Sequence, residues 1–437
     1  MNRITFCAAV IVVVVSMMST SMSQIGSSEQ SSTSSQQTLQ QQVASLAENR
    51  TVHDAFDWFN AQRRALSDMQ LEVTAIPAPP FGEIRRAEWV KQKFQEFGLE
   101  QVQIDGEGNV LGVRPGTDSG AKYVLLSAHL DTVFPSGTKL KVGRDGEKLR
   151  GPGISDNGAG ITALLAIAGS MQQTGLKTNA PILFVGNVGE EGEGDLRGMR
   201  HVFSDQKWKD AIEYTVVLDG GGSDSIVAQG LGSRRFLVTI NGPGGHSWSD
   251  FGTPNPIAVL AKVIDRFNRT SVPANPKTTF NIGSISGGTS VNAIPESASM
   301  KVDVRSSSPV EIERVERSLR NSLNQAMSEY SSTDGKALLT CSVKLIGDRP
   351  AAELLDNARI LQAVRAVDTQ LHIATRMQRA STDANIPLSM GREALTLGAG
   401  GTGGGAHTLH EWYDPTGREL GLKRILLSIL MLTGLSQ

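Results

Sequence analysis

Four carboxylates lie within six consecutive positions, directly after an apolar run of the sequence. They are Glu190, Glu191, Glu193 and Asp195, and the apolar run begins at Pro181. Like charges repel at such short separations, and burial at the end of a strand strengthens the repulsion unless a cation is present. The segment therefore indicates a binding site for a cation.

Three more potential ligand segments follow apolar runs or glycine-rich turns. "SAHLDTV" carries His129 and Asp131, "GPGISDNGAG" carries Asp156, and "VVLDGGG" carries Asp219. His129 and Asp131 are two positions apart at a strand end, so both side chains point to one face, where the carboxylate can orient the imidazole. Taken singly, such a histidine is more often a satisfied surface group, and such an aspartate is more often a helix cap.

A glycine-rich segment near the C-terminus supplies His407, His410 and Glu411. A phosphate-binding loop is disfavoured there, because no Gly-Lys-Ser/Thr follows and no helical pattern begins. With the earlier segments it completes a set of a strand-end His, a turn Asp, a Glu pair, a strand-end Asp and a distant His. Such a mixed nitrogen and oxygen ligand set suits zinc or a similar divalent ion.

The elements that must position these residues alternate between strand and helix. Residues 123–133, 181–191 and 214–222 contain near-continuous apolar runs that end in acidic or imidazole side chains, as buried strands of a mostly parallel sheet do. Residues 158–175 have the composition of an apolar crossover helix. Ligands in open α/β sheets bind beyond the carboxyl ends of the strands, so we expect the candidate ligands at one sheet edge.

The pattern changes to strand–helix–strand–strand–helix–strand between residues 230 and 347. This order predicts a compact α+β sandwich inserted into the first domain. The fold class is therefore α/β, with a mostly parallel-sheet catalytic domain at residues 46–229 and 348–437, interrupted by an inserted domain at residues 230–347.

The N-terminal residues predict export. Residues 1–23 combine Arg3, an apolar run and small residues, which are the three parts of a secretory signal. The alternative is an uncleaved membrane anchor, although the apolar run is shorter than the roughly 20 residues of a span. The Ser/Gln-rich residues 24–45 predict a flexible spacer. We expect a periplasmic or extracellular protein, or a membrane-anchored one if the signal is retained.

Composition excludes some partners and constraints. A formal net charge of −2 over 437 residues argues against a nucleic-acid partner, which would favour a strongly basic surface. Cys341 is the only cysteine after the signal, so no disulfide can form within one mature chain.

Seven motifs in order, from about Val52 to the C-terminus, resemble those of the dinuclear zinc peptidases and deacylases. This family includes peptidase T, glutamate carboxypeptidase, aminoacylase and succinyl-diaminopimelate desuccinylase. The motifs are "SAHLDTV", "GPGISDNGAG", "VGEEGEGDLRG", "VVLDGGG", "NGPGGHS", "SVNAIPESASMKVDVR" and "GAHTLHEW". The resemblance implies a zinc-binding catalytic domain interrupted by a lid domain that often dimerises, and hence a homodimer formed through the inserted domain.

The resemblance also implies the metal ligands. His129 and Asp219 correspond to ligands of one zinc, Glu191 and His407 to ligands of the other, and Asp156 to the bridge. Three ligand carboxylates and a bridging hydroxide carry a charge of about −4, which balances two divalent cations per chain. Cobalt or manganese could substitute for zinc. The alternative ligand His410 is adjacent to Glu411, whereas His407 precedes Glu411 by the four positions that the family shows.

Further roles come from the same resemblance. Asp131 corresponds to the residue that orients His129, and Glu190 to the general base that takes a proton from the water between the ions. His246 corresponds to the lid histidine that stabilises the developing oxyanion, usually in the partner subunit's active site, although a structural histidine at a turn remains the alternative. Asn292 and Arg305 correspond to positions near the carboxylate or carbonyl groups of the substrate. Glu193 and Asp195 receive no role and are expected to be solvated loop acids.

The resemblance favours one substrate class within the family. It associates Asp at the position of Asp219 with aminopeptidase-like members, and Glu with carboxypeptidases and deacylases. The segment "EEGEGDLRG" also resembles that of peptidase T-like members most. We therefore expect zinc-dependent hydrolysis of small peptides by an exported di- or tripeptide aminopeptidase. A carboxypeptidase or an N-acyl-amino-acid deacylase is the alternative, and a non-catalytic metal-binding protein is a third reading.

Overall fold

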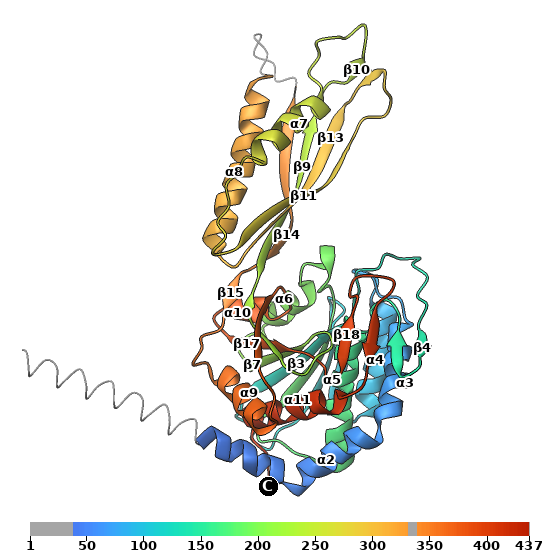
Figure 1. Ribbon diagram of the computed structural model, residues 1–437, viewed down its shortest axis with the longest axis vertical. Helices are drawn as coiled ribbons and strands as arrows, with labels where there is room; N and C mark the ends of the chain where they lie inside the picture. Colours follow the sequence, from blue (N-terminus) through green and yellow to red (C-terminus); the bar gives the residue numbers. More distant parts are fainter. Residues whose placement is uncertain (1–37, 331–338, 437) are drawn as a thin grey trace, which may run out of the picture.

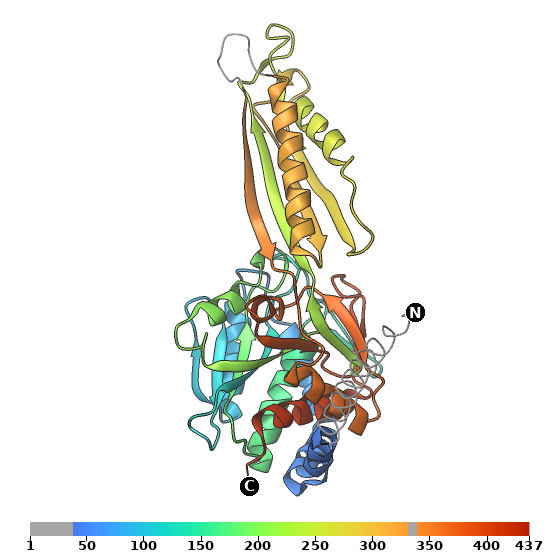
Figure 2. The ribbon, with the colours of Figure 1, turned by 90° about the vertical axis from the view of Figure 1, so that its left-hand side faces the viewer.

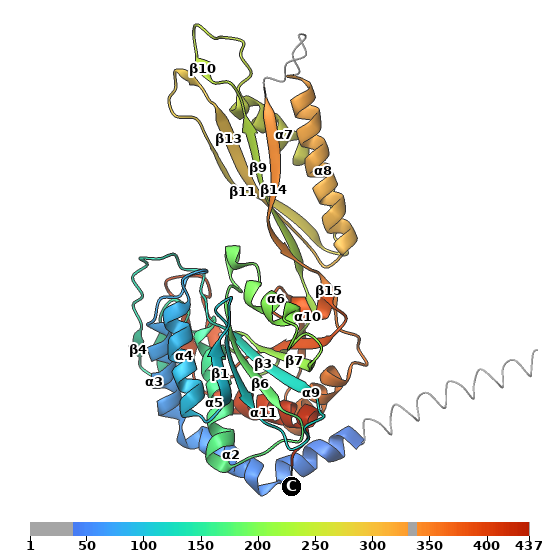
Figure 3. The same cartoon turned by 180° about the vertical axis from the view of Figure 1, so that it is seen from behind.

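Two units of different architecture make up the protein in the computed structural model, which describes residues 38–330 and 339–436. The larger unit contains the described N-terminal and C-terminal segments, and the smaller one extends away from it (Figure 1). The C-terminus lies at the end of the larger unit that faces away from the smaller one (Figures 1 and 3). The predicted signal, residues 1–23, lies outside the described residues.

A nine-stranded mixed sheet forms the centre of the larger unit. Its strands, in spatial order, are β1 (Glu100–Ile104), β2 (Val110–Arg114), β6 (Ile182–Asn187), β3 (Tyr123–His129), β7 (Ile212–Leu218), β17 (Glu393–Leu397), β8 (Ser225–Gly230) and β15 (Ala352–Glu353), with β16 (Arg376–Ala380) also paired to β8. The central strands β6, β3, β7 and β17 run parallel. Antiparallel pairs flank these four strands, and β16 pairs parallel to β8, so the sheet is mixed around a parallel centre.

Helices cover both faces of this sheet. One face packs against α2 (Arg50–Ala61), α3 (Arg63–Thr74), α4 (Ile84–Glu96), α5 (Gly158–Thr174), α9 (Arg359–Gln370) and α11 (Arg418–Thr433). The other packs against α6 (Arg197–Ser204) and α10 (Asn385–Ser389). Alternate residues of β3 divide between the two cores, because successive side chains of a strand point to opposite faces: Leu126 faces the first core and Leu125 the second.

The smaller unit is a two-layer insertion with the element order predicted from the sequence. Its antiparallel sheet has the order β11 (Thr278–Gly287), β13 (Ser297–Ser306), β9 (Gly232–Asn241) and β14 (Thr340–Arg349). The helices α7 (Pro256–Phe267) and α8 (Pro309–Ser328) cover one face of this sheet (Figure 2). A short ribbon of β10 (Gly245–His246) and β12 (Ala293–Ile294) lies at its far tip.

The expected spacer is corrected over its last residues. Residues 38–48 form a helix, whereas a flexible segment was expected as far as residue 45. Leu39, Val43 and Leu46 recur at helical spacing and pack on the core of the larger unit, and Val43 is fully buried. Burial of these three apolar side chains stabilises the helix although the surrounding residues are mostly polar.

None of the helices among residues 38–330 and 339–436 combines the length and apolar character that a membrane span needs.

Candidate metal centre

Three neighbouring parallel strands bring candidate ligands to one edge of the large sheet. His129 is the last residue of β3, Glu190 and Glu191 follow β6, and Asp219 follows β7. Because β6, β3 and β7 are adjacent and parallel, their carboxyl ends meet at this edge.

The five predicted metal ligands form two groups that share Asp156. In the first group, His129 Nε2 lies 3.1 Å from Asp156 Oδ1 and 3.7 Å from Asp219 Oδ1. In the second, His407 Nε2 lies 3.1 Å from both Asp156 Oδ2 and Glu191 Oε1. Each oxygen of Asp156 therefore faces a different group, which is the arrangement that a bridging carboxylate requires.

Two buried atoms at the centre support a cation site. His129 Nε2 and Glu191 Oε1 make no hydrogen bond to any described residue. Buried polar atoms are nearly always paired, so two unpaired ligand atoms that face carboxylate or imidazole neighbours indicate a missing partner. The donor set of imidazole nitrogens and carboxylate oxygens fits zinc and similar divalent ions.

The backbone of Asp131 fixes the imidazole of His129, and its carboxylate fixes the acidic loop. His129 Nδ1 lies 3.1 Å from the carbonyl oxygen of Asp131, so Nδ1 carries the proton and Nε2 presents its lone pair to the ligand groups. The carboxylate is farther, at 3.6 Å. It accepts the N–H groups of Glu190 at 2.9 Å and Glu191 at 2.8 Å. Asp131 thus holds the loop that carries the predicted base Glu190 and the predicted ligand Glu191, which goes beyond the role expected for it.

Asp156 sits in a turn that is held from two sides. Asn157 caps α5 by accepting the N–H of Gly160 at 3.0 Å and donates to the carbonyl of Leu218, the last residue of β7, at 2.9 Å. The carboxylate of Glu411 accepts the backbone N–H of Asp156 at 2.8 Å, and those of two preceding residues of the turn. Burial of Glu411 raises its pKa to about 7, although these hydrogen bonds act to lower it.

The two candidate histidines at the C-terminal loop have different surroundings. His407 belongs to the second ligand group, whereas His410 is exposed and lies in neither group. This loop lies between β18 (Thr402–Gly404) and β19 (Trp412–Asp414). These strands form a small sheet with β5 (Lys148–Arg150) and β4 (Gly143–Asp145), which precede the turn of Asp156. The small sheet therefore brings His407 to Asp156 across a long separation in sequence.

The electrostatic field at both histidines favours positive charge. Burial lowers the pKa of His129, but the nearby carboxylates of Asp131, Asp156 and Asp219 outweigh burial, and the pKa lies well above its ordinary value. The hydrogen bond to Asp156 and the nearby carboxylate of Glu191 raise the pKa of His407 to about 10. The carboxylates therefore attract cations to the positions that the two imidazole Nε2 atoms face.

Glu190 is buried beside the ligand groups and paired with an arginine that the sequence did not reveal. Its Oε1 lies 3.1 Å from Nη1 of Arg349, and Nη2 of Arg349 also donates to the Glu190 carbonyl. Burial raises the pKa of Glu190 well above its ordinary value, and the charge of Arg349 opposes this shift. Arg349 is the last residue of β14, so the insertion contributes directly to the environment of the predicted base.

Asp383 is a second buried acid that sequence reasoning missed. Its Oδ2 accepts a hydrogen bond from Asn187, the last residue of β6, at 2.6 Å. Burial raises the pKa of Asp383 to about 7, and the charges of Asp131 and Asp219 contribute in the same direction.

The predicted lid residues lie away from both ligand groups. His246 and Asn292 are exposed at the tip of the insertion, where the carbonyl of Asn292 accepts the N–H of Ser247 at 3.0 Å (Figure 1). The N–H of Trp248 donates to Nδ1 of His246 at 3.2 Å. Arg305 lies nearer the large unit on β13 and pairs with Asp303 at 2.7 Å.

Glu193 is largely exposed, as expected of a solvated loop acid, whereas Asp195 is half-buried, and both residues contact the insertion. Glu193 pairs with Lys301 of β13 at 2.8 Å. Asp195 accepts the N–H of Asp348 of β14 at 2.9 Å. Figure 3 shows the neighbouring helix α6 beside the strands that connect the two units. The acidic segment therefore joins the metal centre to the base of the insertion.

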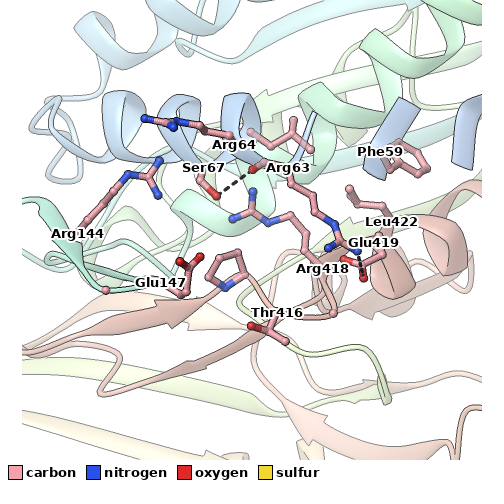
Figure 4. A pocket seen from close by; sticks show the side chains of 14 residues that line it. Phe59, Arg63, Arg64, Ser67, Arg144, Glu147, Thr416, Arg418, Glu419 and Leu422 are labelled. Carbon is pink, nitrogen blue, oxygen red and sulfur yellow. Dashed lines mark hydrogen bonds and ion pairs between the residues drawn. The ribbon is translucent and has the colours of Figure 1, made fainter. Parts of the chain in front are cut away.

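A separate cavity of about 440 Å³ lies between α2, α3 and the start of α11 (Figure 4). Its wall contains Arg63, which pairs with Glu419 at 2.7 Å, and the buried Arg418. None of the predicted ligands or catalytic residues lines this cavity.

Comparisons with known proteins agree with this architecture. Residues 125–430, more than half of the chain, match the model of peptidase family M20/M25/M40. A relative from Arthroderma gypseum named "Probable carboxypeptidase" is 28% identical over 211 residues, which cover 44% of this chain and 44% of the relative. The chain thus spans less than half the length of that relative. "Uncharacterized protein YqjE" of Bacillus subtilis is 22% identical over 353 residues, with 78% of this chain and 91% of the relative covered.

Solved structures share the fold at low sequence identity. The aminopeptidase PepT of Bacillus cereus has a TM-score of 0.66 and 19% identity, with 85% of this chain and 98% of that chain covered. The di-peptidase Dug1p of Saccharomyces cerevisiae has a TM-score of 0.70 and 13% identity, with 87% and 98% covered. At these identities the likeness establishes the fold alone.

Proposed function

The chain belongs to peptidase family M20/M25/M40, and we propose that it is an exported aminopeptidase that hydrolyses di- and tripeptides with two zinc ions bound per chain. The observation that carries this proposal is the pair of ligand groups that share Asp156, with the buried carboxyl of Glu190 beside them. A non-catalytic metal-binding protein would need the ligands but not a buried, arginine-paired acid next to them.

The residues that would hold the ions follow from the two groups. His129, Asp156 and Asp219 would hold one ion, and Asp156, Glu191 and His407 the other. Divalent cations at these positions would polarise the scissile carbonyl and offset the charge of the ligand carboxylates.

Glu190 moves the proton in this proposal. Its carboxylate accepts a proton from the attacking water and passes it to the leaving amine. Burial favours the protonated form of Glu190 and outweighs the charge of Arg349, so the pKa lies well above its ordinary value and the carboxylate takes up a proton readily. The hydrogen bond from its N–H to Asp131 fixes the backbone from which the side chain extends.

His246 would stabilise the negative charge that develops on the carbonyl oxygen. Because Nδ1 of His246 accepts the N–H of Trp248, the proton of a neutral imidazole is on Nε2, which can donate to an oxyanion. Because His246 is exposed at the tip, either a movement of the insertion or the binding of a second subunit must bring it to a metal centre. We propose a homodimer through the insertion, in which this histidine serves the partner subunit's site.

The choice of an aminopeptidase rests on Asp219 and on the resemblance of the acidic segment to peptidase T. The alternative is a carboxypeptidase or a deacylase of the same family, and the name of the Arthroderma gypseum relative favours the carboxypeptidase.

Product analysis on a panel of matched peptides tests this choice. We expect hydrolysis of Leu-Gly-Gly and of its C-terminal amide, because an aminopeptidase needs only the free N-terminus. The N-acetylated peptide should resist hydrolysis. Cleavage of the acetylated peptide together with resistance of the amide would instead identify a carboxypeptidase, and release of acetate would identify a deacylase.

A further inference from the structure

An apolar cavity of about 490 Å³ lies beside the acidic loop of the metal centre. Five of the residues that line it are apolar and come from two loops at the same edge of the large sheet: Pro79, Pro80, Phe81, Val133 and Pro135. Such a concave apolar surface is suited to an apolar group rather than to an ion.

The cavity is continuous with the loops that form the metal centre. Its wall includes Gly192 and Glu193, which directly follow the ligand Glu191. Val133 is two residues beyond Asp131, and the N–H of the intervening Thr132 donates to the carbonyl of Ala78 at 2.9 Å. A peptide whose scissile bond lies at the ligand groups would therefore have this cavity next to it.

Phe81 in the wall of this cavity has an unfavourable backbone conformation and an exposed ring. Its side chain is 68% exposed, and its φ of 69° lies in the left-handed region that bulky residues rarely adopt. A large exposed aromatic side chain on a strained backbone must be held there by its surroundings, and such strain concentrates at binding sites.

Arg197 holds Phe81 and connects it to the acidic loop. The guanidinium carbon lies 4.7 Å from the centroid of the Phe81 ring, and Nη2 donates to both carboxylate oxygens of the buried Glu83 at 2.9 Å. Nη1 packs against Gly189, where an added Cβ would lie 2.2 Å from it. Gly189 directly precedes Glu190, so Arg197 contacts both the ring of Phe81 and the residue before the predicted base.

We propose that this cavity binds an apolar side chain of the substrate next to the scissile bond, and that Phe81 sets the preference for that side chain. The inference rests on the proposed peptidase function. Among the described residues of the wall, Glu193 is the only one with an ionisable side chain, and its pairing with Lys301 leaves little net charge to oppose an apolar occupant.

The test compares Leu-Gly, Gly-Leu and Gly-Gly in the wild type and in Phe81→Asn. Asparagine tolerates the left-handed region, so this change removes the ring without adding backbone strain. We expect the wild type to prefer one leucine peptide over Gly-Gly. In Phe81→Asn, kcat/KM for that peptide should fall about tenfold while Gly-Gly changes less than about twofold.

Two variants control for folding and for surface effects. Phe81→Tyr keeps an aromatic ring and should keep the preference. Leu355→Ala removes a 72% exposed apolar side chain that does not line the cavity, and should change neither peptide. A preference that survives Phe81→Asn, or an equal loss for leucine and glycine peptides, would overturn the inference.

A binding measurement separates this inference from the proposed function. If the wild type hydrolyses no dipeptide, the proposed function fails. Calorimetric titration of the metal-loaded protein with leucine and with glycine then tests the cavity. Leucine binding that weakens in Phe81→Asn, with glycine unaffected, supports the cavity, and equal binding of leucine to both proteins contradicts it.

Discussion

The metal centre and the tip of the insertion present their predicted functional residues in opposite ways. Three of the five predicted ligands, His129, Glu191 and Asp219, lie at or just beyond the carboxyl ends of β3, β6 and β7. The residues of these strands are almost entirely buried, so the sheet fixes where the three ligands lie. His246 on β10 and Asn292, which directly precedes β12, are both exposed. The difference teaches that the sheet edge brings candidate ligands together without any movement, whereas a catalytic role of the tip would require the insertion to move or a second subunit to bind.

The end of the insertion nearest the large unit contacts the acidic segment directly. Arg349 of β14 pairs with Glu190, and Lys301 of β13 pairs with Glu193 of the same acidic segment. A movement of the insertion would therefore change the surroundings of the predicted base as well as the distance of His246.

The strongest test of the comparison is Glu190→Gln. We expect kcat/KM to fall by about 10³-fold, because an amide cannot accept and return the proton. Metal content, measured by atomic emission, should stay unchanged, since Glu190 belongs to neither ligand group. Glu100→Gln, at an exposed position of β1 outside both ligand groups and the cavity, is the matched control and should stay active. Retained hydrolysis in Glu190→Gln would remove this residue from its proposed role.

His246→Ala sharpens the comparison at the other region. We expect kcat to fall about 10²-fold from the loss of one oxyanion donor, with metal content unchanged. If His246 serves the partner subunit's site, mixing this variant with Glu190→Gln should restore about one quarter of wild-type activity through random pairing. A mixture that stays as inactive as its components would argue against a shared site, and full activity of His246→Ala alone would leave a structural turn as its role.

A smaller effect, on the pH dependence of thermal stability, is expected from Asp383→Asn in the presence of a chelator. Burial raises the folded-state pKa of Asp383 to about 7, above its unfolded value, so its contribution to stability is present at low pH and is lost as pH rises through that value. The thermal midpoint of the wild type should fall between about pH 4 and about pH 7, and the variant should show a smaller fall. The exposed Asp57→Asn should behave like the wild type. Identical slopes in all three proteins would show that Asp383 does not titrate in this range.

Local sequence patterns predicted much of the fold because the strands that carry ligands are continuous apolar runs. The grouping of His129 with Asp219 follows from two such runs ending at one edge. Partners that meet only after folding gave no such signal: Glu411 holds a turn 255 positions away, and Arg349 reaches Glu190 across 159. The helix of residues 38–48 was missed because the polar composition of the tract obscured a short apolar stripe.

The number of divalent ions bound per chain tests the central claim most directly. Metal analysis of the purified protein should find two ions per wild-type chain and one in Asp219→Ala, because Asp219 belongs to only one of the two ligand groups. Fewer than two ions in the wild type, or two ions retained in Asp219→Ala, would contradict a centre built from two groups that share Asp156.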